Sequence, residues 1–224
     1  MKKVNLGLRA ALAIIFGVPV VGAMIFLPAW SFDYWEGWAF LEILFTPMAF
    51  FLAYMLKYKR ELMERRLKMK EKRKTQANVQ LFNMILFLTS ITIAGLDNRF
   101  NWSPMPLSFK IFSQAMMFFG YLMFMKTMLH NEYASRVIEI QEGQKLVDTG
   151  PYAVVRHPMY TAAILMYIFI PLALGSFWAV IPLLFLPISI IIRIFDEEKA
   201  LIDSLDGYAD YMKRVRYRLI PYIW

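Results

Sequence analysis

The stretch RHPMYTAAILMYIFIPLALGSFWAVIPLLFLPISIIIRIFDEE, residues 156–198, decides the fold. It contains two apolar runs, 158–174 and 177–194, joined by Gly175-Ser176. Runs of this length approach what a membrane-spanning helix needs, and a glycine between them is a turn signal. The stretch therefore predicts a tight helical hairpin. Its two charged ends are expected to meet at one edge of the membrane, with Arg156 and His157 facing Arg193, Asp196, Glu197 and Glu198.

Long apolar runs continue through the rest of the chain. The 224 residues are 59% hydrophobic with a mean hydropathy of +0.45, well above a soluble domain. We therefore predict an all-α, polytopic transmembrane helix bundle of about six spans, or five if one run lies flat on the membrane. The four spans before the hairpin are expected at residues 8–29, 35–56, 78–96 and 108–129.

Polarity divides the chain into two predicted regions. Residues 1–129 hold the first four helices, and residues 130–224 hold the hairpin and a charged, amphipathic tail. A carboxyl group inside a span is costly, so Glu42 is expected to face the bundle or a cavity. The segment LDNRFNWSPMP, residues 96–106, is expected to be a capped turn at the opposite face from the hairpin's charged ends.

Basic residues predict the orientation. The net charge is +8, and residues 57–74 alone hold ten Lys or Arg and three Glu. Cytoplasmic loops carry such an excess, and it contacts anionic lipid headgroups. The amino terminus, residues 130–157 and the tail are therefore predicted to be cytoplasmic. Because the basic run lies between two apolar spans, membrane lipids are its expected partner and nucleic acid is not.

The residue types limit the chemistry. The chain has no cysteine, which excludes disulfides, thiolate metal sites and cysteine nucleophiles. Two histidines, His130 and His157, are too few for a multi-histidine metal site, so no metal is expected. The remaining candidates are carboxylates, Arg, Lys, Tyr, a single His, or a bound cofactor.

The charged ends of the hairpin allow two interpretations on physical grounds. Arg193 stands among apolar residues, and an ionisable residue there is by default a functional-site hypothesis. Alternatively, Arg193 is an interfacial anchor whose head group reaches the polar layer. His157-Pro158 is equally compatible with an ordinary helix start, since proline suits the first turn.

Two longer segments carry a family resemblance. QKLVDTGPYAVVRHPMY, residues 144–160, precedes RIFDEEKALIDSLDGYADYMKRV, residues 193–215. Together they resemble the isoprenylcysteine carboxyl methyltransferase family, part of a wider group of membrane methyltransferases that includes phospholipid N-methyltransferases. The shared signature is Arg-His-Pro-x-Tyr, an apolar hairpin, then Glu-Glu. A later Gly-x-x-Tyr-x-x-Tyr stretch is matched by Gly207, Tyr208 and Tyr211 with one residue's difference in spacing.

The resemblance implies binding of S-adenosyl-L-methionine without a Rossmann fold, in a pocket on the cytoplasmic side. Glu198 would hold the polar end of the cofactor, and Arg193 would contact the methyl acceptor, which makes these two the implied catalytic pair. A glutamate suits the cofactor's ammonium group, and tyrosine faces suit its sulfonium. The implied cofactor-binding residues are Gln144, Lys145, Leu146, Val147, Tyr152, His157, Pro158, Met159, Tyr160, Glu197 and Glu198.

The acceptor implied by the resemblance is lipophilic, first of all a carboxylate of isoprenylcysteine type. A phospholipid amine and a small hydrophobic thiol or acid stay open as alternatives. So do two other function classes, a sterol-reductase-like enzyme that binds a nicotinamide dinucleotide and a non-catalytic membrane scaffold. The sequence leaves the oligomeric state open.

Overall fold

The chain is all-helical in the part that the structure, a computed structural model, describes, namely residues 6–66, 74–134 and 143–224. This confirms the predicted fold class. Residues 67–73 of the basic run at 57–74 and residues 135–142 of the polar segment at 130–157 lie outside the described residues. The helices are α1 (Leu6–Ala29), α2 (Trp35–Tyr58), α3 (Arg60–Arg66), α4 (Lys74–Phe100), α5 (Leu107–His130), η1 (Gly150–Ala153), α6 (Pro158–Ala173), α7 (Val180–Leu183), α8 (Leu186–Ser204) and α9 (Tyr208–Arg214).

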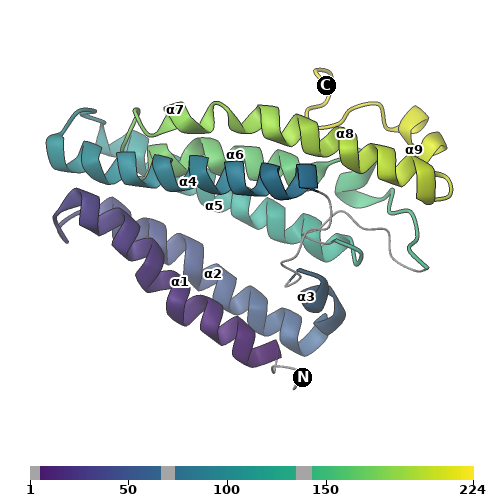
Figure 1. Ribbon diagram of the computed structural model, residues 1–224, viewed down its shortest axis with the longest axis horizontal. Helices are drawn as coiled ribbons and strands as arrows, with labels where there is room; N and C mark the ends of the chain where they lie inside the picture. Colours follow the sequence, from purple (N-terminus) through teal and green to yellow (C-terminus); the bar gives the residue numbers. More distant parts are fainter. Residues whose placement is uncertain (1–5, 67–73, 135–142) are drawn as a thin grey trace.

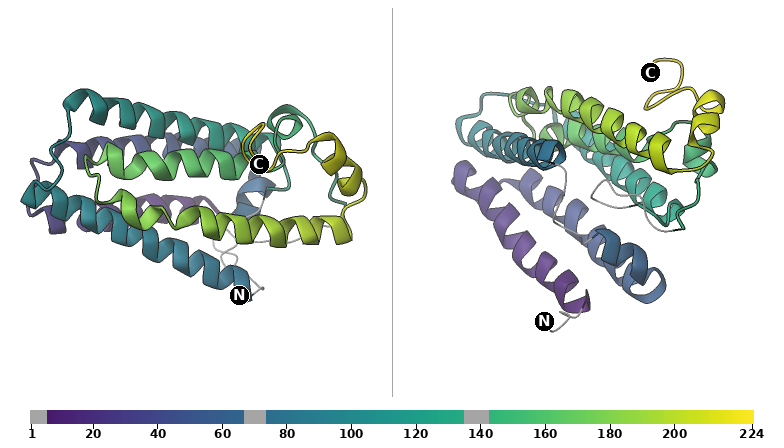
Figure 2. Two further views of the ribbon diagram at one scale, coloured as in Figure 1. Left: turned by 90° about the horizontal axis from the view of Figure 1, so that it is seen from above. Right: turned by 45° about the vertical axis from the view of Figure 1, so that its right-hand side comes forward.

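Among the described residues, four helices, α1, α2, α4 and α5, are long and apolar enough to cross a membrane. The hairpin adds the shorter apolar helix α6 and the helix α8, whose first half is apolar. Figures 1 and 2 show α6 and α8 running alongside α4 and α5. The helices α1 and α2 form a second layer that diverges from the other four toward the end where α3 lies (Figure 1).

The second arm of the hairpin differs from the expected single run at 177–194. It begins with the short helix α7, and α8 starts at Leu186. Pro182 and Pro187 lie at this break, where proline cannot donate a backbone hydrogen bond. The helix α8 then continues ten residues beyond Ile194, so Arg193 and both glutamates lie on one helix that extends past the apolar layer.

Two glycines set close helix crossings. A Cβ atom on Gly120 of α5 would lie 3.1 Å from the backbone nitrogen of Met166 on α6. One on Gly95 of α4 would lie 2.6 Å from the carbonyl oxygen of Ile25 on α1. Small residues permit this approach where lipid supplies no hydrophobic driving force between helices.

Buried polar contacts fasten the end of the bundle opposite α9. The buried Asp97 accepts hydrogen bonds from the amide and hydroxyl of Ser103, at 2.8 and 2.6 Å, and from the hydroxyl of Ser176. The predicted turn therefore starts later than expected, because α4 continues to Phe100, and it is joined to the turn of the hairpin. An ion pair between Glu36 and Lys110 lies at the same end.

The expectation for Glu42 was wrong. Its side chain is exposed on α2 and accepts a hydrogen bond of 2.8 Å from the hydroxyl of Thr46, one turn later. This local partner accounts for one of its oxygens.

Candidate functional site

The Arg-His-Pro segment is held by the carboxy-terminal tail. The backbone amides of Arg156 and His157 donate to the carbonyls of Tyr217 and Arg218, both at 2.9 Å. One turn into α6, the hydroxyl of Thr161 donates to the carbonyl of Leu219 at 2.8 Å. His157 is the N-cap residue of α6, and Pro158 occupies the first turn, where its missing amide proton has no cost.

Glu198 lies at the centre of a buried charge cluster. Its carboxylate accepts from Arg156 Nε at 2.7 Å and Arg218 Nε at 2.9 Å, and His157 Nε2 lies 3.3 Å away. Burial alone would raise the pKa of Glu198, but hydrogen bonds from His157 and Arg156 and their charges outweigh it and lower the pKa to about 2. The cluster therefore joins α8, the start of α6 and the tail through an ionised carboxylate.

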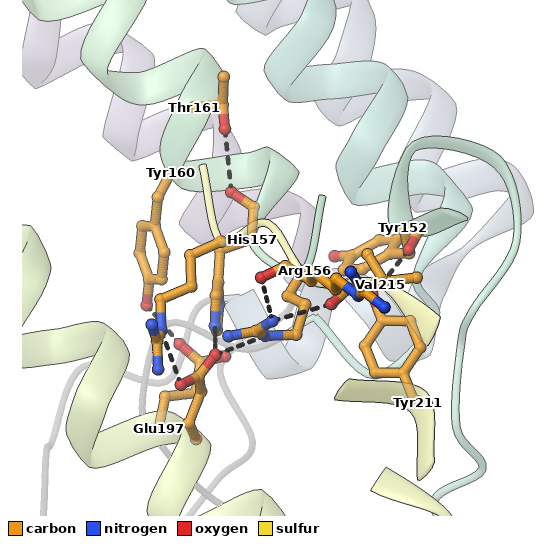
Figure 3. Close-up of polar contacts among 11 residues, drawn as sticks. Tyr152, Arg156, His157, Tyr160, Thr161, Glu197, Tyr211 and Val215 are labelled. Atoms are coloured by element: carbon orange, nitrogen blue, oxygen red, sulfur yellow. Dashed lines mark hydrogen bonds and ion pairs between the residues drawn. The ribbon is translucent and has the colours of Figure 1, made fainter. Parts of the chain in front are cut away.

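Glu197 belongs to a second chain of contacts, which runs toward α4. The hydroxyl of Tyr160 donates to Glu197 Oε2 at 2.6 Å and accepts from Arg193 Nε at 2.7 Å. Arg193 Nη1 lies 3.3 Å from Oε1 of Gln76, a fully buried residue of α4 whose Nε2 donates to Asp196 at 2.7 Å. Figure 3 shows Tyr160 beside Glu197 on one side of His157 and Arg156, with Tyr152 and Tyr211 on the other.

A pocket of about 120 Å³ opens between these groups. It brings together segments far apart in the sequence, from the end of α5 to α9. Its lining residues are Asn131, Tyr133, Ala134, Gln144, Lys145, Leu146, Val147, Tyr152, Arg156, His157, Met159, Tyr160, Arg193, Glu197, Leu201, Leu205, Tyr208 and Tyr211.

Most of the residues singled out from the sequence meet in this pocket. Of the implied site residues, only Pro158 and Glu198 are missing from its lining. Pro158 is buried in the first turn of α6, and Glu198 lies in the charge cluster described above. The role of Glu198 at the polar end of a cofactor stays a prediction, whereas the carboxylate that lines the pocket is that of Glu197.

Other residues that line the pocket were not predicted from the sequence. Tyr208 and Tyr211 were noted only as part of the signature, although both are almost fully buried. The hydroxyl of Tyr211 donates to the carbonyl of Tyr152 at 2.7 Å. Within the part of the chain that the structure describes, the buried hydroxyl of Tyr208 has no hydrogen-bond partner. Burial, with the nearby charges of Glu198 and Glu197, raises the pKa of Tyr208, so this hydroxyl keeps its proton.

A second cavity, of about 350 Å³, adjoins the first. The two share Met159, Tyr160 and Arg193. The second cavity lies between α4, α5, α6 and α8, and except for Gln80, Asn83, Arg193 and the hydroxyl groups of Tyr160 and Tyr167 its lining is apolar. The residues that complete it are Met84, Phe87, Phe124, Ala163, Tyr167, Leu186 and Ile190.

The polar residues of α4 carried a signal that the sequence reasoning did not use. Gln76, Gln80 and Asn83 follow one another at intervals of four and three residues, which places them on one face of the helix. A polar stripe on an otherwise apolar span marks a face turned toward a partner or a cavity.

Residues 109–205 match the family model of the phospholipid methyltransferases. The match covers less than half of the chain and runs from α5 through most of the region that lines the two cavities. A search of curated proteins gave no match. The family match indicates a membrane methyltransferase.

Proposed function

We propose that this protein transfers a methyl group from S-adenosylmethionine to a lipid that reaches the site from within the membrane. The observation that supports this most directly is the junction of the two cavities at Met159, Tyr160 and Arg193. The first pocket, at the end of the bundle, is lined by charged as well as apolar residues, and it meets a mostly apolar cavity between the helices. A water-soluble donor and an oily acceptor can meet only at such a boundary.

The charged and aromatic residues of the first pocket suit the chemistry of the donor. S-adenosylmethionine supplies a methyl group on a sulfonium and also carries an ammonium and a carboxylate. The carboxylate of Glu197 is a partner for the ammonium, and the rings of Tyr152 and Tyr160 suit the sulfonium. The unpartnered hydroxyl of Tyr208 is a donor for a carboxylate or ribose oxygen, within the described part of the chain.

Arg193 would orient the acceptor. Its guanidinium lines both cavities, and its contacts with Tyr160 and Gln76 hold it at their junction. A planar guanidinium binds carboxylate or phosphate through two parallel hydrogen bonds. Methyl transfer requires mainly alignment of the two reacting atoms, and an arginine fixed on both sides supplies it.

Two acceptor groups fit this arrangement. A carboxylate of isoprenylcysteine type would lie against Arg193 and is already anionic, so no base is required. A phospholipid amine would place its phosphate against Arg193, and the family match favours this second candidate. An amine must lose a proton, and the carboxylate of Glu197, which lines the first pocket and accepts from Tyr160 at the junction, can receive it.

The test is a pair of assays on the purified protein. We expect binding of labelled S-adenosylmethionine and transfer of its methyl group to an isoprenylcysteine analogue or to phosphatidylethanolamine in detergent micelles. Binding of a nicotinamide dinucleotide instead would favour the reductase alternative. Absence of binding by both cofactors would leave the scaffold alternative.

A further inference from the structure

The second cavity is lined by a residue whose side-chain amide lacks a hydrogen-bond acceptor within the described part of the chain. Nε2 of Gln80 is buried, and no residue in the described ranges accepts a hydrogen bond from it. Asn83, the next polar residue on the same face of α4, does have a hydrogen-bond partner: its Oδ1 accepts from the hydroxyl of Ser189 at 2.5 Å. A buried amide donor without an acceptor is costly, and the cost is greater among apolar side chains.

The position of Gln80 relative to Arg193 defines where a ligand atom would lie. Arg193 contacts Gln76, and Gln80 follows Gln76 by four residues on α4. At the rise of an α-helix, Gln80 is about 6 Å farther along the axis, toward the opposite end of the bundle. A lipid whose anionic group contacts Arg193 would therefore present to Gln80 an atom a few bonds along its chain.

We infer that Gln80 determines acceptor specificity by donating a hydrogen bond to a carbonyl oxygen of the lipid, which selects acceptors of the acyl-ester class. This inference rests on the proposed function, since it takes the second cavity as the acceptor site. In a glycerophospholipid, ester carbonyls follow the phosphate after the short glycerol backbone. In an isoprenylcysteine, that stretch of chain carries a thioether sulfur, which is a weak acceptor.

The inference is tested with two lipids that differ only in the carbonyl. Dioctanoyl phosphatidylethanolamine has ester carbonyls, and its dioctyl ether analogue lacks them. Their affinities are read from the concentration dependence of the melting temperature of the purified protein, a measure that requires no methyl transfer. The wild-type protein should bind the ester lipid more tightly, by roughly three- to tenfold for one neutral hydrogen bond.

Variants on α4 test whether the preference for the ester lipid depends on the side chain of Gln80. Gln80→Leu should bind both lipids equally and, without lipid, should melt at the same temperature as wild type or higher, because it removes an unsatisfied donor. Asn78→Leu also replaces a side-chain amide by leucine, but at an exposed position of the same helix that does not line the cavity, and it should keep the preference. Gln80→Met, close to glutamine in shape, replaces Gln80→Leu if the latter folds poorly.

Three results would overturn the inference: equal binding of both lipids by the wild type, an ester preference that survives in Gln80→Leu, or binding of neither lipid. A different result would contradict the proposed methyl transfer. A preference that depends on Gln80, without methylation of either lipid, would support the lipid subsite and contradict the methyl transfer.

Discussion

Glu197 and Glu198 are consecutive residues of α8 whose carboxylates lie in different environments, one in the pocket and the other in a buried charge cluster. Glu198 is 3% exposed and is bound by Arg156 and Arg218, with His157 close by. Glu197 lines the pocket and accepts from the hydroxyl of Tyr160. Adjacent side chains on a helix point about 100° apart, so one pair of glutamates reaches two environments.

Replacing each glutamate by glutamine should therefore give different phenotypes. Glu197→Gln should weaken S-adenosylmethionine binding roughly ten- to hundredfold, from the loss of a charge-assisted hydrogen bond. Its stability should change little. Glu198→Gln leaves Arg156 and Arg218 without a buried anion, and should reduce the free energy of unfolding by about 3–5 kcal/mol.

Calorimetric titration with the cofactor and denaturant unfolding in detergent measure the two effects. A Glu198→Gln protein that is fully stable but no longer binds the cofactor would support the role that the family resemblance gives to Glu198. Unchanged binding by Glu197→Gln would contradict the role proposed for Glu197.

Glu198 should also make stability depend on pH. Its pKa falls from an ordinary 4.5 to about 2 in the folded protein. A group with a lowered folded-state pKa stabilises the protein above its unfolded pKa, and this contribution is lost as the pH falls from 4.5 toward 2. The melting temperature of the wild type should therefore drop across this interval. A Glu198→Gln profile with an equally steep drop would assign the effect to other carboxylates.

Two neighbouring tyrosines provide a matched pair. Tyr211→Phe removes the hydrogen bond to the Tyr152 carbonyl and should cost about 1–2 kcal/mol of stability. Tyr208→Phe removes a hydroxyl that has no partner among the described residues, so stability should be unchanged or higher. We expect Tyr208→Phe to weaken S-adenosylmethionine binding several-fold instead. Thermal unfolding and cofactor titration on both variants separate the two roles, and equal behaviour of the pair would contradict them.

The helices of the bundle could largely be read from the sequence, because each is a long apolar run. Their ends could not, since they depend on distant partners. The helix α4 extends through Asp97 because Ser103 and Ser176 satisfy this carboxylate. Pro182 and Pro187 mark the break between α7 and α8 in the sequence. The length of α8 also depends on the contacts of Glu198, which no local sequence pattern encodes.

Site residues that belong to a local sequence motif could be predicted. Contacts made by the carboxy-terminal tail, which folds back onto the site, could not. Ten of the site residues implied by the family resemblance line the pocket, Arg193 and Glu197 included. The sequence does not show that Arg218 binds Glu198 or that the backbone of the tail pairs with that of Arg156. These contacts join distant segments, and no local sequence pattern links them. The polar stripe on α4 could be recognised in the sequence. Which residues it faces could not, because they lie on α8.

Orientation is tested with single cysteines, which the natural chain lacks. Ser108→Cys changes an exposed residue in the first turn of α5, and Ser204→Cys changes the exposed last residue of α8, at the other end of the bundle. The Lys and Arg distribution predicts that Ser204→Cys is labelled from the cytoplasm and Ser108→Cys from the other side. A membrane-impermeant maleimide applied to intact cells and to lysed cells measures this, and labelling of both from the same side would contradict an odd number of crossings between them.

Arg193 should affect turnover far more than cofactor affinity. Its contacts with Tyr160 and Gln76 hold the guanidinium where the two cavities meet, while His157 lies against Glu198 and stacks on Tyr160. Arg193→Ala should therefore reduce kcat strongly and leave the Kd for S-adenosylmethionine within a few-fold. Arg193→Lys should restore little activity, because an ammonium cannot form two parallel bonds to an anionic acceptor.

The comparison variant is His157→Ala, which should weaken cofactor binding because it removes a wall of the pocket. Both variants are measured in a methyl-transfer assay and in a binding assay. If Arg193→Ala abolishes cofactor binding and His157→Ala preserves it, the two roles are reversed. If Arg193→Ala is fully active, the acceptor carries no anionic group at the junction, and neither a carboxylate nor a phospholipid phosphate lies against this arginine.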